Sequence, residues 1–106
     1  MKYGFIGCGN MGGAIARALS QATKDIAVSD RSGRAAVLAT ELGIAYTDNA
    51  HIADECDVIF LGVKPHMMKD VLLPLQPKLG LRKPLLITMA AGLTIDTIEG
   101  FAGVRL

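Results

Sequence analysis

The chain has 106 residues, the size of one small domain. Its net charge is +1 and its acidic and basic residues are interspersed, which favours neither nucleic acid nor an anionic membrane as a partner. Two cysteines do not make a disulfide framework or a metal-ligand cluster, and no apolar run is long enough to cross a bilayer. We therefore expect a cytoplasmic domain with no signal peptide and no metal site.

The opening of the chain carries its strongest motif. A short apolar run at residues 3–6 predicts a strand, and glycines follow at positions 7, 9 and 12 with the spacing Gly-x-Gly-x-x-Gly. Gly7 would permit a tight strand-to-helix turn, Gly9 would let the backbone approach a pyrophosphate, and Gly12 would let the next helix pack closely on the strand. That helix begins near residue 10 or 11, and its unpaired N–H groups favour a bound phosphate.

An acidic residue further along the chain strengthens this prediction. Asp30 stands at the end of the next predicted strand, residues 25–29, about 20 positions after the glycines, where a ribose-binding carboxylate is expected. A glycine turn without a ligand is the alternative, and the strand, the helix and the acidic residue together argue against it. Asp30 suits the ribose hydroxyls of NAD(H). The same strand end also holds residues that could bind the 2′-phosphate of NADP(H), namely Ser29, Arg31, Ser32 and Arg34.

Strands and helices are expected to alternate through the rest of the chain. Apolar periodicity predicts helices at about 11–22, 33–42, 49–55, 65–75 and 94–101, and further strands at 44–46, 57–63, 85–89 and 104–106. The run at 57–63 is nearly continuously apolar, as is typical of a central parallel strand covered on both faces. We predict an α/β fold in one domain, residues 1–106: a Rossmann-type doubly wound parallel sheet with strand order 3-2-1-4-5-6.

Several details of these elements are predicted as well. The first helix is expected to bury an apolar stripe, and Ser32 is expected to cap the second helix. The fourth helix should begin at Pro65, bury Met67 or Met68, and bend or end at Pro74. Cys8 is interpreted as a small residue that fills the glycine turn. The stripe of the first helix comprises Met11, Ile15, Ala18, Leu19 and Ala22.

Ligands of such sheets lie outside the carboxyl ends of the strands, which directs attention to residues 7–12, 30–32, 62–65 and 89–92. These stretches resemble the N-terminal domain of the pyrroline-5-carboxylate reductases. The segments that carry the resemblance are GFIGCGNM at 4–11, SDRS at 29–32, GVKP at 62–65 and AAGLTI at 90–95. The family generally has alanine or another small residue where Cys8 stands.

The resemblance implies an enzyme that reduces the C=N bond of 1-pyrroline-5-carboxylate to make proline, with NADP(H) favoured over NAD(H). It implies that residues 6–11 hold the pyrophosphate, that Asn49 lies near the adenosine half, and that residues 63–65 and 89–91 lie near the nicotinamide half. The cofactor-binding residues expected from motif and resemblance together are Ile6, Gly7, Cys8, Gly9, Asn10, Met11, Gly12, Ser29, Asp30, Arg31, Ser32, Asn49, Val63, Lys64, Pro65, Met89, Ala90 and Ala91.

The family continues beyond this length into a helical domain that forms the dimer and much of the imine pocket. By that resemblance we expect this chain to be the cofactor-binding part of a longer homo-oligomeric enzyme, and to be inactive alone. No residue is assigned as catalytic. His51 and His66 are expected to be surface histidines, and Lys64 either contacts the cofactor or packs along a helix start.

Two other kinds of protein share the glycine turn. Dehydrogenases of the 6-phosphogluconate, 3-hydroxyacid and prephenate types have a similar domain but would lack the Val-Lys-Pro and Ala-Ala-Gly-Leu-Thr segments found here. A regulatory module that senses dinucleotides, as on potassium-transport proteins, would bind the cofactor and catalyse nothing.

Overall fold

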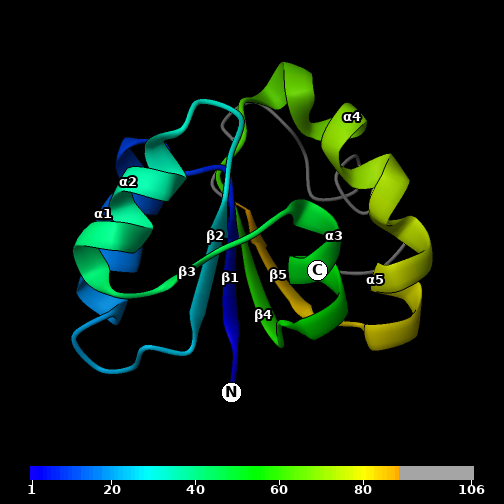
Figure 1. Ribbon diagram of the computed structural model, residues 1–106. Coiled ribbons are helices and arrows are strands. Elements are labelled where there is room, and N and C mark those ends of the chain that lie inside the picture. The colour runs from blue at the N-terminus through cyan, green and yellow to red at the C-terminus, as the bar shows by residue number, and fades with distance from the viewer. Residues whose placement is uncertain (89–106) are drawn as a thin grey trace.

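Five parallel strands form one sheet in the computed structural model, which describes residues 1–88 apart from the side chain of Asn10 (Figure 1). The strand order is β3-β2-β1-β4-β5, and every neighbouring pair is parallel. The predicted fold class and the predicted order of these five strands are confirmed. The sixth strand and the helix at 94–101 fall outside the described residues. The strands are β1 (Tyr3–Ile6), β2 (Ile26–Ser29), β3 (Ala45–Tyr46), β4 (Val58–Leu61) and β5 (Leu85–Thr88).

Helices cover both faces of this sheet (Figure 1). One face carries α1 (Asn10–Leu19) and α2 (Arg34–Leu42), and the other carries α3 (Asn49–Glu55), α4 (Met68–Leu72) and α5 (Gln76–Arg82). Two 3₁₀ turns, η1 (Pro65–Met67) and η2 (Leu73–Leu75), flank α4. None of the helices within residues 1–88 is long and apolar enough to cross a membrane.

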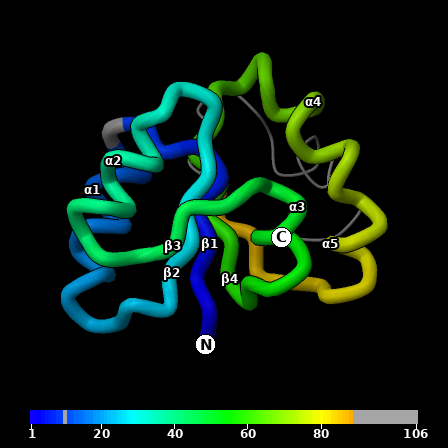
Figure 2. The backbone as a smooth tube through the Cα atoms, viewed as in Figure 1, coloured from blue at the N-terminus to red at the C-terminus, as the bar shows by residue number. Residues whose placement is uncertain are grey.

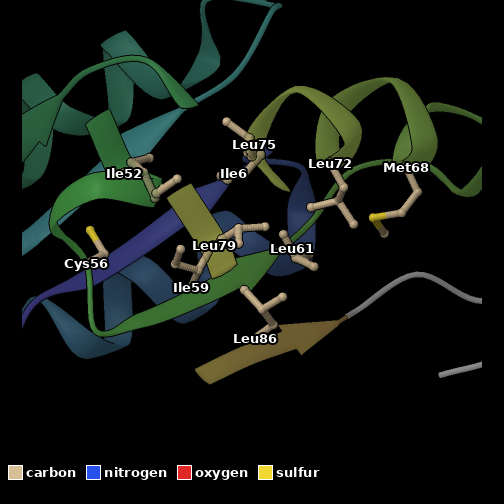
Figure 3. Packing of buried hydrophobic residues seen from close by; sticks show 11 residues of the cluster. Ile6, Ile52, Cys56, Ile59, Leu61, Met68, Leu72, Leu75, Leu79 and Leu86 are labelled. Carbon is tan, nitrogen blue, oxygen red and sulfur yellow. The ribbon is translucent and has the colours of Figure 1, made fainter. Parts of the chain in front are cut away.

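The larger core lies between the sheet and helices α3 to α5 (Figure 3). Met68 is fully buried there, whereas Met67 is only half-buried, which resolves the alternative left open by the sequence. The single helix predicted at 65–75 is instead η1, α4 and η2 in succession, with a change of helical type just before Pro74, where a bend or an end was expected. Helix α5 follows directly and was not predicted. This core contains Ile6, Ile52, Ala53, Cys56, Ile59, Leu61, Met68, Leu72, Leu75, Leu79 and Leu86.

The smaller core lies under α1 and α2, on the other face. Successive side chains of β1 point to opposite faces, so Phe5 enters this core while Ile6 enters the larger one. The ring of Phe5 stacks on that of Phe60, its register partner in β4, with centroids 4.6 Å apart and planes inclined by 7°. The pair joins the two central strands of the sheet through their side chains as well as through the backbone.

The predicted inner face of α1 is wrong in part. Met11 is 62% exposed and Ala18 is exposed, whereas Ala16 is fully buried and Ser20 is nearly so. Ser20 tolerates burial because its hydroxyl donates to the carbonyl of Arg17 at 2.7 Å. Small residues on this face let the helix approach the sheet, and they give a weaker apolar period than large residues would.

Gly4 has a packing role that the motif analysis did not single out. It lies in β1 directly beneath α3, and a Cβ atom there would be 2.5 Å from Cγ2 of Ile52 and 2.9 Å from Sγ of Cys56. Contacts this short would force the strand and the helix apart. The close approach of α3 to the central strand therefore requires glycine at this position.

We predict that Gly4→Ala lowers the free energy of unfolding by about 1–3 kcal/mol, the usual cost of overpacking a core. Gly80→Ala is the matched control, because a Cβ atom there meets nothing within 4 Å and the residue lies inside α5. The control should leave stability unchanged or raise it by about 0.5–1 kcal/mol. Urea denaturation of both variants decides the matter, and equal stabilities would contradict the packing argument.

Candidate functional site

The carboxyl ends of β1, β2 and β4 meet at one edge of the sheet, at the top of the view in Figure 2. The connections to α1, α2 and η1 leave from this edge and enclose a cleft of about 370 Å³, within the range of small-molecule sites. The cleft is lined by Ile6, Gly7, Cys8, Gly9, Ser29, Asp30, Arg31, Ser32, Arg34, Asn49, Gly62, Val63, Lys64 and Met67.

Gly7 joins three strand ends at the base of the cleft. Its φ of +87° lies in the left-handed region, and a Cβ atom would be 2.7 Å from the carbonyl carbon of Gly62. Its N–H donates to the carbonyl of Ser29 at 2.7 Å, and the N–H of Gly62 donates to the carbonyl of Ile6 at 2.8 Å. The tight turn predicted at Gly7 is confirmed.

Gly9 is glycine for a different reason. It precedes α1 with an ordinary extended conformation (φ −76°), and a Cβ atom there would meet nothing within 4 Å. Neither the backbone conformation at this residue nor the packing of the described residues therefore requires glycine. Because Gly9 lines the cleft, a side chain would extend into space that a ligand can use. Among the described residues no side chain caps α1, and its first turn has no acidic residue, so the N–H groups there are available to an anion.

Asp30 holds the start of α2. Ser32 is not the N-cap residue as predicted, although its hydroxyl accepts from the N–H of Arg34 at 3.4 Å. Gly33 is the N-cap residue, in a left-handed conformation with φ +83°. The Oδ1 atom of Asp30 accepts from the N–H of Gly33 at 3.2 Å, and its Oδ2 atom accepts from the N–H of Ala35 and the hydroxyl of Ser32, both at 3.0 Å. Both carboxylate oxygens are thus engaged within the protein.

Three cationic side chains lie around the same cleft. Arg31 and Arg34 flank the start of α2, and Lys64 follows the end of β4. All three are exposed, and none forms a salt bridge in the part of the chain that the structure describes. Since the charge of Asp30 faces the amides of α2, this edge of the sheet presents positive charge to a ligand.

Ser29 and Asn49 form a polar pair in the cleft. The hydroxyl of Ser29 donates to Oδ1 of Asn49 at 2.6 Å. Asn49 is the first residue of α3, whose N-cap Asp48 accepts from the N–H of His51 at 2.8 Å. The pair thus connects the end of β2 to the start of α3.

Cys8 fills the glycine turn and is not an activated thiol. It is 5% exposed, and burial raises the pKa of its thiol to about 11, with the carboxylate of Asp30 acting in the same direction. A backbone hydrogen bond with Ser29 opposes these effects without cancelling them. The interpretation of Cys8 as a small filler is supported.

The structure gathers most of the predicted site residues in this cleft. Met11, Gly12 and Pro65 do not line it, and Met11 is largely exposed on α1. Met89, Ala90 and Ala91 lie outside the described residues, as does the side chain of Asn10. Among the lining residues, Arg34 had been considered for a 2′-phosphate and Gly62 lies in a stretch singled out by topology, whereas Met67 was missed. The position of Pro65 at a turn after β4 is the signal that could have placed Met67 there.

The two histidines lie away from the cleft lining. His51 is exposed on α3, where its Nε2 pairs with the carboxylate of Glu55, and His66 is exposed in η1. Within residues 1–88 no group of three or more histidine, cysteine or acidic side chains is arranged to hold a metal ion.

Comparison with known proteins gives this cleft a family context. The model of the family described as NADP oxidoreductase, coenzyme F420-dependent, matches residues 2–92. The chain belongs to this family. It is 36% identical to the pyrroline-5-carboxylate reductase of Aquifex aeolicus over 97% of its own length and 38% of that enzyme's. The chain thus spans about two fifths of the curated relatives it matches.

Solved structures agree with this relationship. A pyrroline-5-carboxylate reductase from Coxiella burnetii matches 96% of this chain and 40% of its own with a TM-score of 0.88 and 34% identity. The pyrroline carboxylate reductase of Plasmodium falciparum, solved with NADP bound, matches 96% of this chain and 38% of its own with a TM-score of 0.80 and 29% identity. The resemblance inferred from the four sequence segments is confirmed.

We predict that the Cys8 thiol of the native chain reacts with iodoacetamide at pH 8 about a hundredfold more slowly than in the unfolded chain, because raising its pKa from 9.0 to about 11 removes thiolate. The native rate should rise with pH up to that value. Peptide-resolved mass spectrometry with and without urea measures both rates. Equal rates would show that the turn is open or that the helix N-terminus activates the thiol.

Proposed function

We propose that this chain binds NADP(H) and forms the cofactor-binding part of a pyrroline-5-carboxylate reductase, which acts in proline biosynthesis. The observation that carries this proposal is the cleft at the carboxyl edge of the sheet. There, within residues 1–88, a helix start without a side-chain cap, an open position at Gly9 and two arginines without a salt bridge converge. The relatives matched over nearly the whole chain supply the reaction and the substrate class.

The residues present fit a dinucleotide pyrophosphate at the β1–α1 turn. The open space beside Gly9 is the volume that such a group would occupy, and the N–H groups of the first turn of α1 have no intrahelical partner. A phosphate there would accept from these groups and gain from the helix dipole. Met11 and Gly12 lie in this first turn but do not line the cleft, so on this proposal their part is limited to backbone N–H groups at the helix start.

The residues at the end of β2 fit NADP(H) better than NAD(H). A ribose-binding carboxylate needs free acceptor sites, and the carboxylate of Asp30 already accepts three hydrogen bonds of this chain. The guanidinium groups of Arg31 and Arg34 form no salt bridge with any residue that the structure describes and can make charge-assisted bonds to a 2′-phosphate. The repulsion that the carboxylate of Asp30 would exert on a 2′-phosphate is reduced, because its negative charge is turned toward the amides of α2.

When bound, NADPH supplies the hydride that reduces the imine carbon. This chain's part is to hold the cofactor so that its nicotinamide is presented at the carboxyl edge, beside Val63 and Lys64. Hydride transfer requires about 3–3.5 Å between donor and acceptor carbons, so the imine must also be oriented. We propose that a further, helical part of the full-length homo-oligomeric enzyme provides that pocket.

We predict that Gly9→Val abolishes dinucleotide binding and leaves the fold intact. The valine methyl groups would occupy the space assigned to the pyrophosphate, while the extended backbone at this residue accepts a β-branched side chain. Gly80→Val is the matched control, since that position is also open but lies in α5. Calorimetric titration with NADPH measures affinity. Unchanged affinity in a folded Gly9→Val variant would contradict the pyrophosphate assignment.

We predict a preference for NADP(H) that depends on Arg31. Removing one charge-assisted partner costs on the order of 1.5–3 kcal/mol, so Arg31→Ala should weaken NADPH binding roughly ten- to a hundredfold and leave NADH binding nearly unchanged. Arg17→Ala is the control, because Arg17 pairs with Glu41 away from the cleft. A wild-type chain that binds NADH more tightly than NADPH would show that the preference is reversed.

We predict that the 106-residue chain binds NADPH but does not reduce 1-pyrroline-5-carboxylate. The phosphate and ribose contacts lie within it, whereas orientation of the imine, which contributes up to about 7–11 kcal/mol, needs the rest of the enzyme. The test compares the chain with the full-length protein in a coupled NADPH-oxidation assay. Turnover by the short chain at a rate near that of the full-length protein would contradict the proposed division between the two parts.

A further inference from the structure

We propose that Ser29 is a positioning residue, which orients the side-chain amide of Asn49 toward the cofactor instead of contacting the cofactor itself. The inference rests on the proposed dinucleotide site, and it assigns different roles to two residues that the sequence placed together as cofactor contacts.

Ser29 is held rigidly by the sheet. It is 6% exposed at the end of β2, it pairs in register with Ile6 of β1, and its carbonyl accepts from the N–H of Gly7 at 2.7 Å. Its hydroxyl has one donor, and that donor is directed to Oδ1 of Asn49 at 2.6 Å. A buried hydroxyl whose proton is already engaged has no donor left for the phosphate oxygens of a ligand.

Asn49 is the member of the pair that still has hydrogen-bond donors for a ligand. It lines the cleft and is half-buried, and its side-chain N–H₂ group makes no hydrogen bond to any part of the protein within residues 1–88. Because Ser29 engages the amide oxygen, the N–H₂ group is the end left for a ligand. It can donate two hydrogen bonds to acceptors such as ribose hydroxyls, a purine nitrogen or a phosphate oxygen.

Without the bond from the serine hydroxyl, the amide of Asn49 would lose the hydrogen bond that the described residues provide to its oxygen. The terminal torsion of asparagine is broad and roughly two-fold, so the oxygen could then face the cleft as readily as the N–H₂ group. An oxygen in that place would repel the acceptor atoms of the ligand. By donating to Oδ1, the hydroxyl favours the orientation in which the N–H₂ group is left for the ligand.

The pair also lies at a definite end of the cleft. Ser29 is followed directly by Asp30 and Arg31, where the 2′-phosphate is assigned. Asn49, at the start of α3, is hydrogen-bonded to the hydroxyl of Ser29. Asn49 should therefore serve the adenosine half of the cofactor and not the nicotinamide half. Its loss is expected to affect affinity and to leave hydride transfer from bound cofactor unchanged.

The test is a double-mutant cycle with Ser29→Ala, Asn49→Ala and the double variant, using calorimetry with NADPH and with adenosine 2′,5′-bisphosphate. We expect each single variant to bind both ligands about tenfold more weakly, and the double variant to bind no more weakly than Asn49→Ala alone. Ser29→Thr, which keeps the hydroxyl, should restore most of the affinity. In the full-length enzyme Ser29→Ala should raise the KM for NADPH and leave kcat unchanged.

Losses that add in the double variant would show that Ser29 acts independently of Asn49 and would overturn the proposal. So would a Ser29→Ala variant that binds as wild type does, or one that lowers the Tm and kcat without changing KM. Failure of the proposed function is distinguishable, because it would appear as a wild-type chain without affinity for either ligand.

Discussion

The turn at Gly7 is the constraint on which the rest of the site depends. A backbone with φ +87° and a neighbouring carbonyl carbon 2.7 Å from the place of a Cβ atom leave room for glycine alone. Through this residue and Gly62, the ends of β1, β2 and β4 are hydrogen-bonded to one another. Their following loops consequently diverge from one point, and the space between them is the cleft.

The acidic and basic side chains at the cleft have different partners: the acid binds backbone amides, and the bases are left for a ligand. The carboxylate of Asp30 satisfies amides at the start of α2, including that of its N-cap Gly33, so its negative charge stabilises the helix. Arg31 and Arg34 have no such internal partner in the described part of the chain. The start of α2 is therefore stabilised by the carboxylate of Asp30, while the guanidinium groups of Arg31 and Arg34 beside it are available to an anion.

The sequence predicted the parts of this arrangement that depend on local chemistry. Glycine spacing located the turn, and the alternation of strands with helices gave the order of the five described strands. The inner face of α1 was predicted wrongly in part, because glycine and alanine carry that face and give little periodic signal. Helix α5 was missed because Pro77 and Gly80 obscure its pattern, although Pro77 lies in its first turn, where no N–H is needed.

The roles of individual side chains at the cleft could be assigned only from the three-dimensional structure. Asp30 reads as a ribose ligand until the bonds to Gly33 and Ala35 are seen, since these depend on how the loop folds back. The bond between Ser29 and Asn49 joins residues 20 positions apart in the chain, and no local pattern encodes it. Gly4 likewise shows its role only when α3 is laid across β1.

The most direct test of this account is an NMR titration of the ¹⁵N-labelled chain with NADPH. The account predicts shifts of the amides at residues 7–12, 30–35 and 62–64, which surround the cleft at the carboxyl edge. A second cavity of about 310 Å³, lined by residues such as Tyr3, Ile26 and Tyr46, provides the internal comparison. The amide resonances of the residues that line this second cavity should not shift. Shifts confined to that second cavity, or no shifts at all, would contradict the assignment of the cofactor to the glycine turn.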